Sequence, residues 1–94
     1  MRALPWTTAF VLAAMLVGSV PSPALAQGDI CSRLWVERNT IYKENGYCFK
    51  TSRAISYFGN AGCRYDDEAD VPLSRGDRAR IARIQAEERD LGCR

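Results

Sequence analysis

Four cysteines constrain most strongly how this 94-residue chain can fold: Cys31, Cys48, Cys63 and Cys93. A domain of this size has only a marginal hydrophobic core, and an even number of cysteines in a small exported protein is typical of a disulfide framework. The alternative is a zinc site with four thiolate ligands. Such sites use closely spaced cysteine pairs, whereas at least 14 residues separate neighbouring cysteines here. The spacing therefore predicts two disulfides.

Residues 1–26 have the pattern of a secretory signal peptide. Arg2 provides a basic start, residues 9–17 form an unbroken apolar run, and Ala24-Leu25-Ala26 is a small-x-small cleavage site. The run is too short for a membrane anchor, because a bilayer span needs about 20 apolar residues. We therefore predict cleavage between Ala26 and Gln27. The mature residues 27–94 would then be periplasmic or secreted, without a membrane span.

The composition argues against several classes of function. The chain has no histidine, which removes His-based catalysis and imidazole metal ligands, and its net charge of +2 is too small to indicate a nucleic acid as the main partner. Glu37 and Glu44 could be compared with the paired carboxylates of glycosidases, but a domain this small can hardly build the cleft that such a site needs. We expect no catalytic, metal or cofactor site.

The longest helical pattern covers about residues 30–45. Seven residues recur there at the three- and four-residue spacing of one helix face: Cys31, Leu34, Trp35, Arg38, Ile41, Tyr42 and Asn45. Asp29 is expected to cap the start of this helix, and Asn45-Gly46 to end it, because both residue types tolerate the left-handed conformation that stops a helix.

A second, short helix is expected over residues 52–58, capped by Thr51 or Ser52 and ended by the glycine-containing segment 59–62. Its inner face is expected to contain Ala54, Ile55 and Phe58. An acidic loop follows, with its carboxylates at residues 66–70.

The third helix is expected to begin after Ser74, whose spacing to Asp77 is that of a capping box, and to end at Gly92. Its inward-facing large apolar residues are Ile81, Ile84 and Leu91. With so few of them, the helix is expected to cover a core made of aromatic residues. The fold class is therefore mostly α: a small three-helix domain, stapled by disulfides, after a cleaved signal peptide.

The sequence allows three ways of pairing the four cysteines. If consecutive helices are antiparallel, Cys63 returns near Cys31, and the third helix carries Cys93 toward Cys48. This layout favours the pairs Cys31–Cys63 and Cys48–Cys93.

Residues 34–49 resemble the bacterial YARHG domain, which is named for a Tyr-Ala-Arg-His-Gly motif. The pair Arg38-Asn39, then Ile41-Tyr42, then the Gly-aromatic-x-Phe segment from Gly46 to Phe49 stand at the family's spacing. The resemblance covers roughly residues 31–60. It implies an association with the bacterial cell surface and envelope, and it implies no particular activity, because the family's molecular function is unknown.

The resemblance marks six residues as a structural motif: Arg38, Asn39, Tyr42, Asn45, Gly46 and Phe49. Of the five residues that name the family, this chain keeps Tyr42 and Gly46. Glu44 stands where the family has Arg, so any ligand contact made by that Arg does not carry over to this chain.

Arg38 lies in the middle of the apolar stripe, where a charge needs a partner. We expect it to hold a carboxylate of the 66–70 loop or the carbonyls of a helix end. The alternative is that Arg38 binds an anionic ligand.

The tyrosines leave a second choice open, because Tyr47, Tyr57 and Tyr65 could form an aromatic surface or belong to the core. Taken together, the sequence predicts an exported binding or structural module that is not an enzyme. Its partner would be a protein or a cell-wall component of the envelope. The alternative function is inhibition of an envelope hydrolase, with the acidic 66–70 loop entering the foreign active site.

Overall fold

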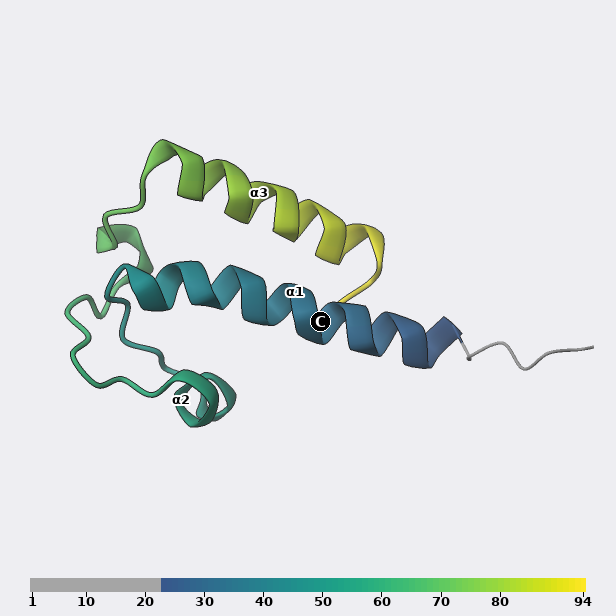
Figure 1. Ribbon diagram of the computed structural model, residues 1–94, viewed down its shortest axis with the longest axis horizontal. Coiled ribbons are helices and arrows are strands. Elements are labelled where there is room, and N and C mark those ends of the chain that lie inside the picture. Colours follow the sequence, from purple (N-terminus) through teal and green to yellow (C-terminus); the bar gives the residue numbers. More distant parts are fainter. Residues whose placement is uncertain (1–22) are drawn as a thin grey trace, which may run out of the picture.

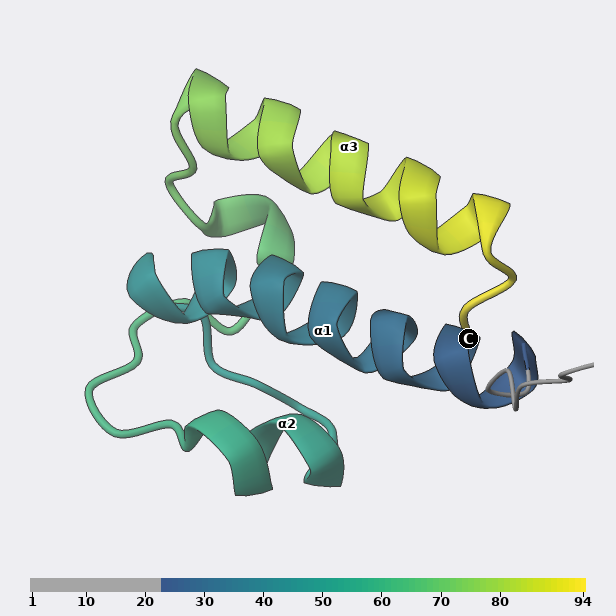
Figure 2. The same cartoon turned by 45° about the vertical axis from the view of Figure 1, so that its right-hand side comes forward.

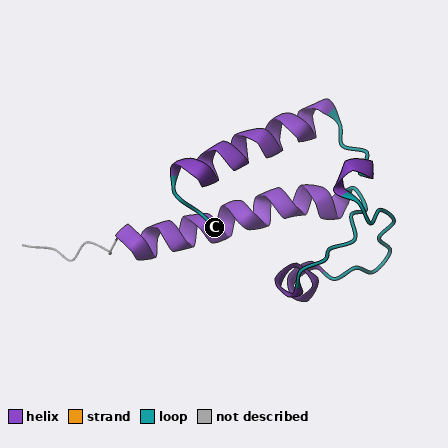
Figure 3. Ribbon diagram, turned by 180° about the vertical axis from the view of Figure 1, so that it is seen from behind, coloured by secondary structure: helices purple, strands orange, loops and turns teal. Residues whose placement is uncertain are grey.

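The computed structural model describes residues 23–94, and they form three α-helices and one short 3-10 helix. The elements are α1 (Pro23–Glu44), α2 (Ser52–Phe58), η1 (Glu68–Asp70) and α3 (Arg75–Asp90). The long helix α1 lies in the middle, with α3 along one side and α2 on the other (Figure 1). No strand occurs among these residues, as the colouring by secondary structure also shows (Figure 3). The prediction of a mostly helical, three-helix domain is confirmed.

Helices α1 and α3 run antiparallel. Near the end of α1, the Asn45 Nδ2 atom donates a 3.4 Å hydrogen bond to Asp77 Oδ2 in the first turn of α3. Near the other end of the pair, a disulfide joins Cys31 of α1 to Cys93, which follows α3. The C-terminus consequently lies beside α1 (Figure 2). The two helices are thus tied together at both ends.

The local signals for α2 and α3 are confirmed. The Thr51 hydroxyl accepts a hydrogen bond from the Ala54 amide at the start of α2. Ser74 and Asp77 form the expected capping box of α3, with each side chain bonded to the other residue's backbone amide. These caps satisfy amides that have no partner inside the helix.

The start of α1 differs from the prediction, because the helix begins at Pro23 and Asp29 therefore lies inside it rather than capping it. Proline fits a first helical position, since the N–H that it lacks would have no partner there. Gly28 and Asp29 are exposed. The helix continues through them without the apolar periodicity that marks it from residue 30 onward.

The predicted signal peptide, residues 1–26, lies almost entirely outside the described residues. The expected cleavage point between Ala26 and Gln27 falls within the first turns of α1, so export processing stays a prediction. Among the described helices, none has the length and apolar character that crossing a membrane requires.

The core has two parts, one on each side of α1. Leu34 and Ile41 pack against Ile81 and Ile84 of α3, so this part is aliphatic. The aromatic part lies between α1 and α2 and begins at Trp35, which is turned about 100° from Leu34 around the helix axis. The expectation that α3 covers an aromatic core is therefore wrong, because α3 packs on the aliphatic face.

All four cysteines form disulfides, as predicted, but the pairs are Cys31–Cys93 and Cys48–Cys63. The favoured pairing is wrong because α2 is too short. Its 7 residues advance the chain by only about 10 Å, whereas Cys31 lies more than three turns before the end of α1. The 16 residues of α3 span about 24 Å and do carry Cys93 back to Cys31.

Backbone pairing brings Cys63 to Cys48. Tyr47 and Tyr65 form an isolated parallel bridge, and the Cys48 amide donates a 2.8 Å hydrogen bond to the Tyr65 carbonyl. The segment after α2 therefore returns to the end of α1 rather than to its start. This second disulfide stabilises the part of the molecule that contains α2.

Candidate binding surface

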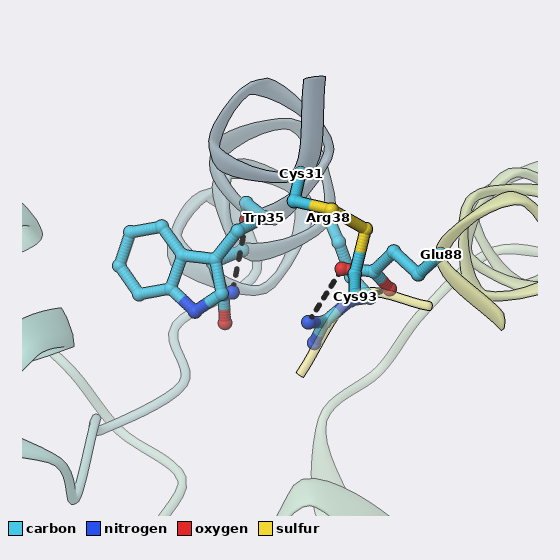
Figure 4. Close-up of polar contacts among 6 residues, drawn as sticks. Cys31, Trp35, Arg38, Glu88 and Cys93 are labelled. Atoms are coloured by element: carbon cyan, nitrogen blue, oxygen red, sulfur yellow. Dashed lines mark hydrogen bonds and ion pairs between the residues drawn. A yellow bond between two sulfur atoms is a disulfide. The ribbon is translucent and has the colours of Figure 1, made fainter. Parts of the chain in front are cut away.

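Arg38 is held by a carboxylate, as expected, but the carboxylate belongs to Glu88 of α3 and not to the 66–70 loop. Its Nε and Nη2 atoms donate to the two Glu88 oxygens at 2.8 and 3.1 Å. In Figure 4 the Arg38 side chain extends toward Glu88 and α3, whereas the Trp35 ring extends away from α3. Because both oxygens of a mostly buried Glu88 are used, Arg38 fits a structural role better than a ligand contact.

The acidic loop is instead attached to α1 through Tyr42, whose hydroxyl hydrogen-bonds to Glu68. Burial of the Tyr42 side chain raises its pKa above the usual value, and the charge and hydrogen bond of Glu68 raise it further, while Arg38 lowers it slightly. The folded protein therefore favours the neutral phenol, which donates to the Glu68 carboxylate.

We expect this contact to weaken in alkali. Because the folded-state pKa of Tyr42 is raised above its unfolded value of 10.0, its contribution to stability is complete below that pH and is lost as the pH rises through the folded-state pKa. Urea unfolding of the wild type and Tyr42→Phe across this range measures the effect. The stability difference between them should stay constant below the unfolded pKa and shrink above it; a difference that grew with pH would contradict the assignment.

The two asparagines of the motif bond to the helix that carries them. Asn39 is buried and donates from Nδ2 to the Trp35 carbonyl at 2.9 Å. Asn45 donates to the Ile41 carbonyl at 2.7 Å, in addition to its contact with Asp77. Asn45 was predicted to help end α1, and the structure adds a link to the first turn of α3.

Gly46 ends α1 as predicted, with φ of +89°, a conformation that side chains disfavour. Its carbonyl accepts hydrogen bonds from the amides of Arg64 and Tyr65 at 2.7 and 3.0 Å. A Cβ atom at this position would lie 3.2 Å from the Tyr65 ring. Phe49, the last residue of the motif, is buried. The contacts of these motif residues therefore lie within the fold, where they connect its elements.

Asn60 is a structural residue that the sequence analysis missed. Its Oδ1 accepts from the Phe49 amide at 2.7 Å, and its Nδ2 donates to the Phe49 carbonyl at 3.0 Å. The Asn60 side chain thus satisfies both backbone groups of Phe49, as a neighbouring strand would do in a sheet. The only available signal was an asparagine among the glycines at 59–62, and that pattern indicated no more than a turn.

The aromatic part of the core is a continuous series of ring contacts. Phe58 lies 5.7 Å from Trp35 and stacks on Phe49 at 5.0 Å. From Phe49 the contacts continue to Tyr47 at 5.2 Å and from there to Tyr42 at 5.6 Å. The series therefore begins and ends on α1, at Trp35 and Tyr42, and packing against neighbouring rings fixes the side chains between them.

At the outer end of this series lie Trp35, Arg53 and Tyr57, which we call the Trp-Arg-Tyr cluster. The Arg53 guanidinium carbon lies 3.8 Å from the centre of the Trp35 ring, over its face. Tyr57 meets Trp35 edge-on at 5.9 Å. Tyr57 is 61% exposed, which makes it a surface residue. The three tyrosines therefore do not form one aromatic surface. Tyr57 lies at the surface, whereas Tyr47 and Tyr65 are partly buried.

Ile55 is also exposed, at 42%, although the sequence predicted it to face inward. It lies two residues from both Arg53 and Tyr57, so it projects from the opposite flank of α2. Ala54 and Phe58 alone form the inner face of this short helix. Ile55 therefore does not belong to the Trp-Arg-Tyr cluster.

A shallow hollow of about 360 Å³ beside the Cys31–Cys93 disulfide is a competing site. Its lining residues are Arg38, Gln85, Glu88, Arg89, Cys93 and Arg94. The ion pair between Arg38 and Glu88 already satisfies the two charges at its base. The Trp-Arg-Tyr cluster is the stronger candidate, because its donors and its aromatic surface face solvent.

The comparison with protein families finds that the model of the YARHG domain matches residues 8–89. The match is longer than the resemblance over residues 31–60, and it extends from within the predicted signal peptide to the last turn of α3. Neither the comparison with curated proteins nor the comparison with solved structures finds a match.

Proposed function

The chain belongs to the YARHG domain family, and from its geometry we propose that it is a non-catalytic binding module of the bacterial envelope. It would hold a partner protein at the Trp-Arg-Tyr cluster. The observation that carries this proposal is the exposure of Tyr57 beside an arginine that lies over Trp35.

The composition of the cluster favours a protein partner. Trp, Tyr and Arg are the residues most enriched among those that dominate the energy of protein interfaces. Such residues bind best when they are held rigidly before the partner arrives, because less conformational entropy is then lost. Here Phe58 packs between Trp35 and Phe49, and the Cys48–Cys63 disulfide joins the segments on either side of α2, so the cluster is held in place before a partner binds.

The location in the envelope has separate support. Two disulfides indicate an oxidising compartment outside the cytoplasm. Export through the predicted signal peptide, followed by retention in the periplasm or release, would place the domain there. The non-catalytic role is supported by a chain without histidine, whose cysteines are all bonded to one another.

A pair of matched variants tests the proposal. We expect the oxidised wild type to capture an envelope protein after crosslinking, and Ile55→Ala to capture the same protein equally well. Tyr57→Ala should capture about tenfold less of it, as the loss of an interface hot spot implies. Both variants remove an exposed side chain from α2, so both should fold. Equal capture by Tyr57→Ala and wild type would refute the binding surface.

A parallel experiment addresses the cell wall. The oxidised protein is co-sedimented with peptidoglycan sacculi that have been stripped of protein, and a reduced and alkylated sample serves as the control for folding. Binding to stripped sacculi that Tyr57→Ala abolishes would make the wall itself the partner and overturn the proposal of a protein partner.

A second candidate function is inhibition of an envelope hydrolase by the acidic loop. The Asp66 side chain is 88% exposed, and its contact with Lys50 at 3.2 Å lies at the surface. The loop is held in one shape, because Asp67 caps η1 and Glu68 bonds to Tyr42. If the protein acts in this way, adding it to an envelope extract lowers hydrolase activity; unchanged activity removes this candidate.

A further inference from the structure

Arg53 is positioned by the fold, and it has no acidic partner among the residues that the structure describes. Within residues 23–94, the ion pairs are Arg38–Glu88 and Lys50–Asp66, and α2 itself contains no acidic residue. The guanidinium lies over the Trp35 ring, and this contact uses its face rather than its N–H groups. Its donors therefore remain available to a ligand.

Exposed arginines are ordinarily solvated and mobile, and several arginines of α3 are exposed. Arg53 differs from them because the 3.8 Å contact with Trp35 holds its charge in one place. Tyr57, one helical turn further along α2, brings an exposed hydroxyl to the same side. Two hydrogen-bond donors, one of them charged, thus flank one aromatic ring.

We propose that the partner protein binds this cluster through an acidic segment, and that the Arg53 guanidinium donates hydrogen bonds to a carboxylate of that segment. The inference rests on the proposed function and specifies the chemistry of the partner. A guanidinium presents paired N–H donors that match the two oxygens of a carboxylate, as Arg38 and Glu88 show within this same molecule. Apolar parts of the segment would contact Tyr57 and the uncovered part of Trp35.

The same geometry disfavours a sugar ligand. A glycan that stacks on an aromatic ring needs an open ring face, and Arg53 covers a face of Trp35. A second copy of this chain is another possible source of carboxylates, through the exposed 66–70 loop. In that loop, however, three of the four carboxylates already have contacts: Asp66 with Lys50, Asp67 with the start of η1 and Glu68 with Tyr42.

The test uses the protein purified after export, in its oxidised form and labelled with nitrogen-15. The probe is an end-blocked peptide of alternating glutamate and glycine, and the control peptide has glutamine in place of glutamate. We expect the glutamate peptide alone to shift the Arg53 Nε–H and Trp35 indole N–H resonances. Arg53→Gln should weaken its binding about tenfold or more, as the loss of a charged hydrogen bond implies, and Ile55→Ala should leave it unchanged.

Arg53→Lys separates geometry from charge, because lysine keeps the charge but lacks the planar pair of donors; we expect intermediate binding. Several results would overturn the inference: no shift, equal shifts with the glutamine peptide, shifts confined to the arginines of α3, or shifts produced by an N-acetylglucosamine oligosaccharide. Resonances of the cluster that move on dilution without peptide would point to a second copy of the chain instead.

Failure of the carboxylate inference can be distinguished from failure of the proposed binding surface. If Tyr57→Ala loses the crosslinked partner while Arg53→Gln keeps it, the binding surface stands and the carboxylate inference fails. If both variants capture the partner as the wild type does, both proposals fail.

Discussion

Replacing Cys31 and Cys93 together by serine is expected to lower the free energy of unfolding by about 4 kcal/mol. The disulfide joins residues 62 positions apart, so its loss frees a long loop in the unfolded chain. The matched control is the removal of Cys48 and Cys63, which are only 15 positions apart. This shorter loop predicts a smaller loss of about 3 kcal/mol.

Urea unfolding under non-reducing conditions, with both double variants measured beside the wild type, gives these free energies. A larger loss from the Cys48/Cys63 variant would contradict the loop-length argument. The two disulfides also stabilise different parts of the molecule. We expect the Cys48/Cys63 variant to disturb the resonances of the Trp-Arg-Tyr cluster, and the Cys31/Cys93 variant to disturb mainly the contact between α1 and α3.

Arg38→Met is expected to cost about 2–3 kcal/mol of stability. The Glu88 side chain is only 14% exposed, and the substitution leaves its carboxylate without the two hydrogen bonds from Arg38. Adding Glu88→Leu to the same chain should restore much of the loss, because an apolar pair replaces the ion pair and no charge is left without a partner. Thermal or urea unfolding of the two single variants and the double variant measures this coupling.

The same variants distinguish the two interpretations of Arg38. If Arg38 is structural, the Arg38→Met/Glu88→Leu double variant should capture the partner as well as the wild type does. Unchanged stability of Arg38→Met together with lost capture would instead make Arg38 a ligand contact and move attention to the hollow beside Cys93.

The sequence by itself determined the features that depend on neighbours within about one helical turn. The bounds of α2, a cap at Thr51 or Ser52, the capping box of Ser74 and Asp77 and the helix stop at Gly46 were all predicted, and the structure selects Thr51 as the cap. Each rests on a hydrogen bond or a backbone conformation that a few consecutive residues specify. The presence of two disulfides followed from cysteine number and spacing, which likewise need no fold.

Only the tertiary structure decided which distant residues meet. The disulfide pairing, the choice of Glu88 as the partner of Arg38, and the attachment of Asn60 to Phe49 depend on how far each helix carries the chain and which side of α1 it then covers. The exposure of Tyr57 and the position of Arg53 over Trp35 have the same origin. A short α2 and a long α3 on opposite sides of α1 set those distances, and periodicity within a helix does not encode which neighbour its faces will meet.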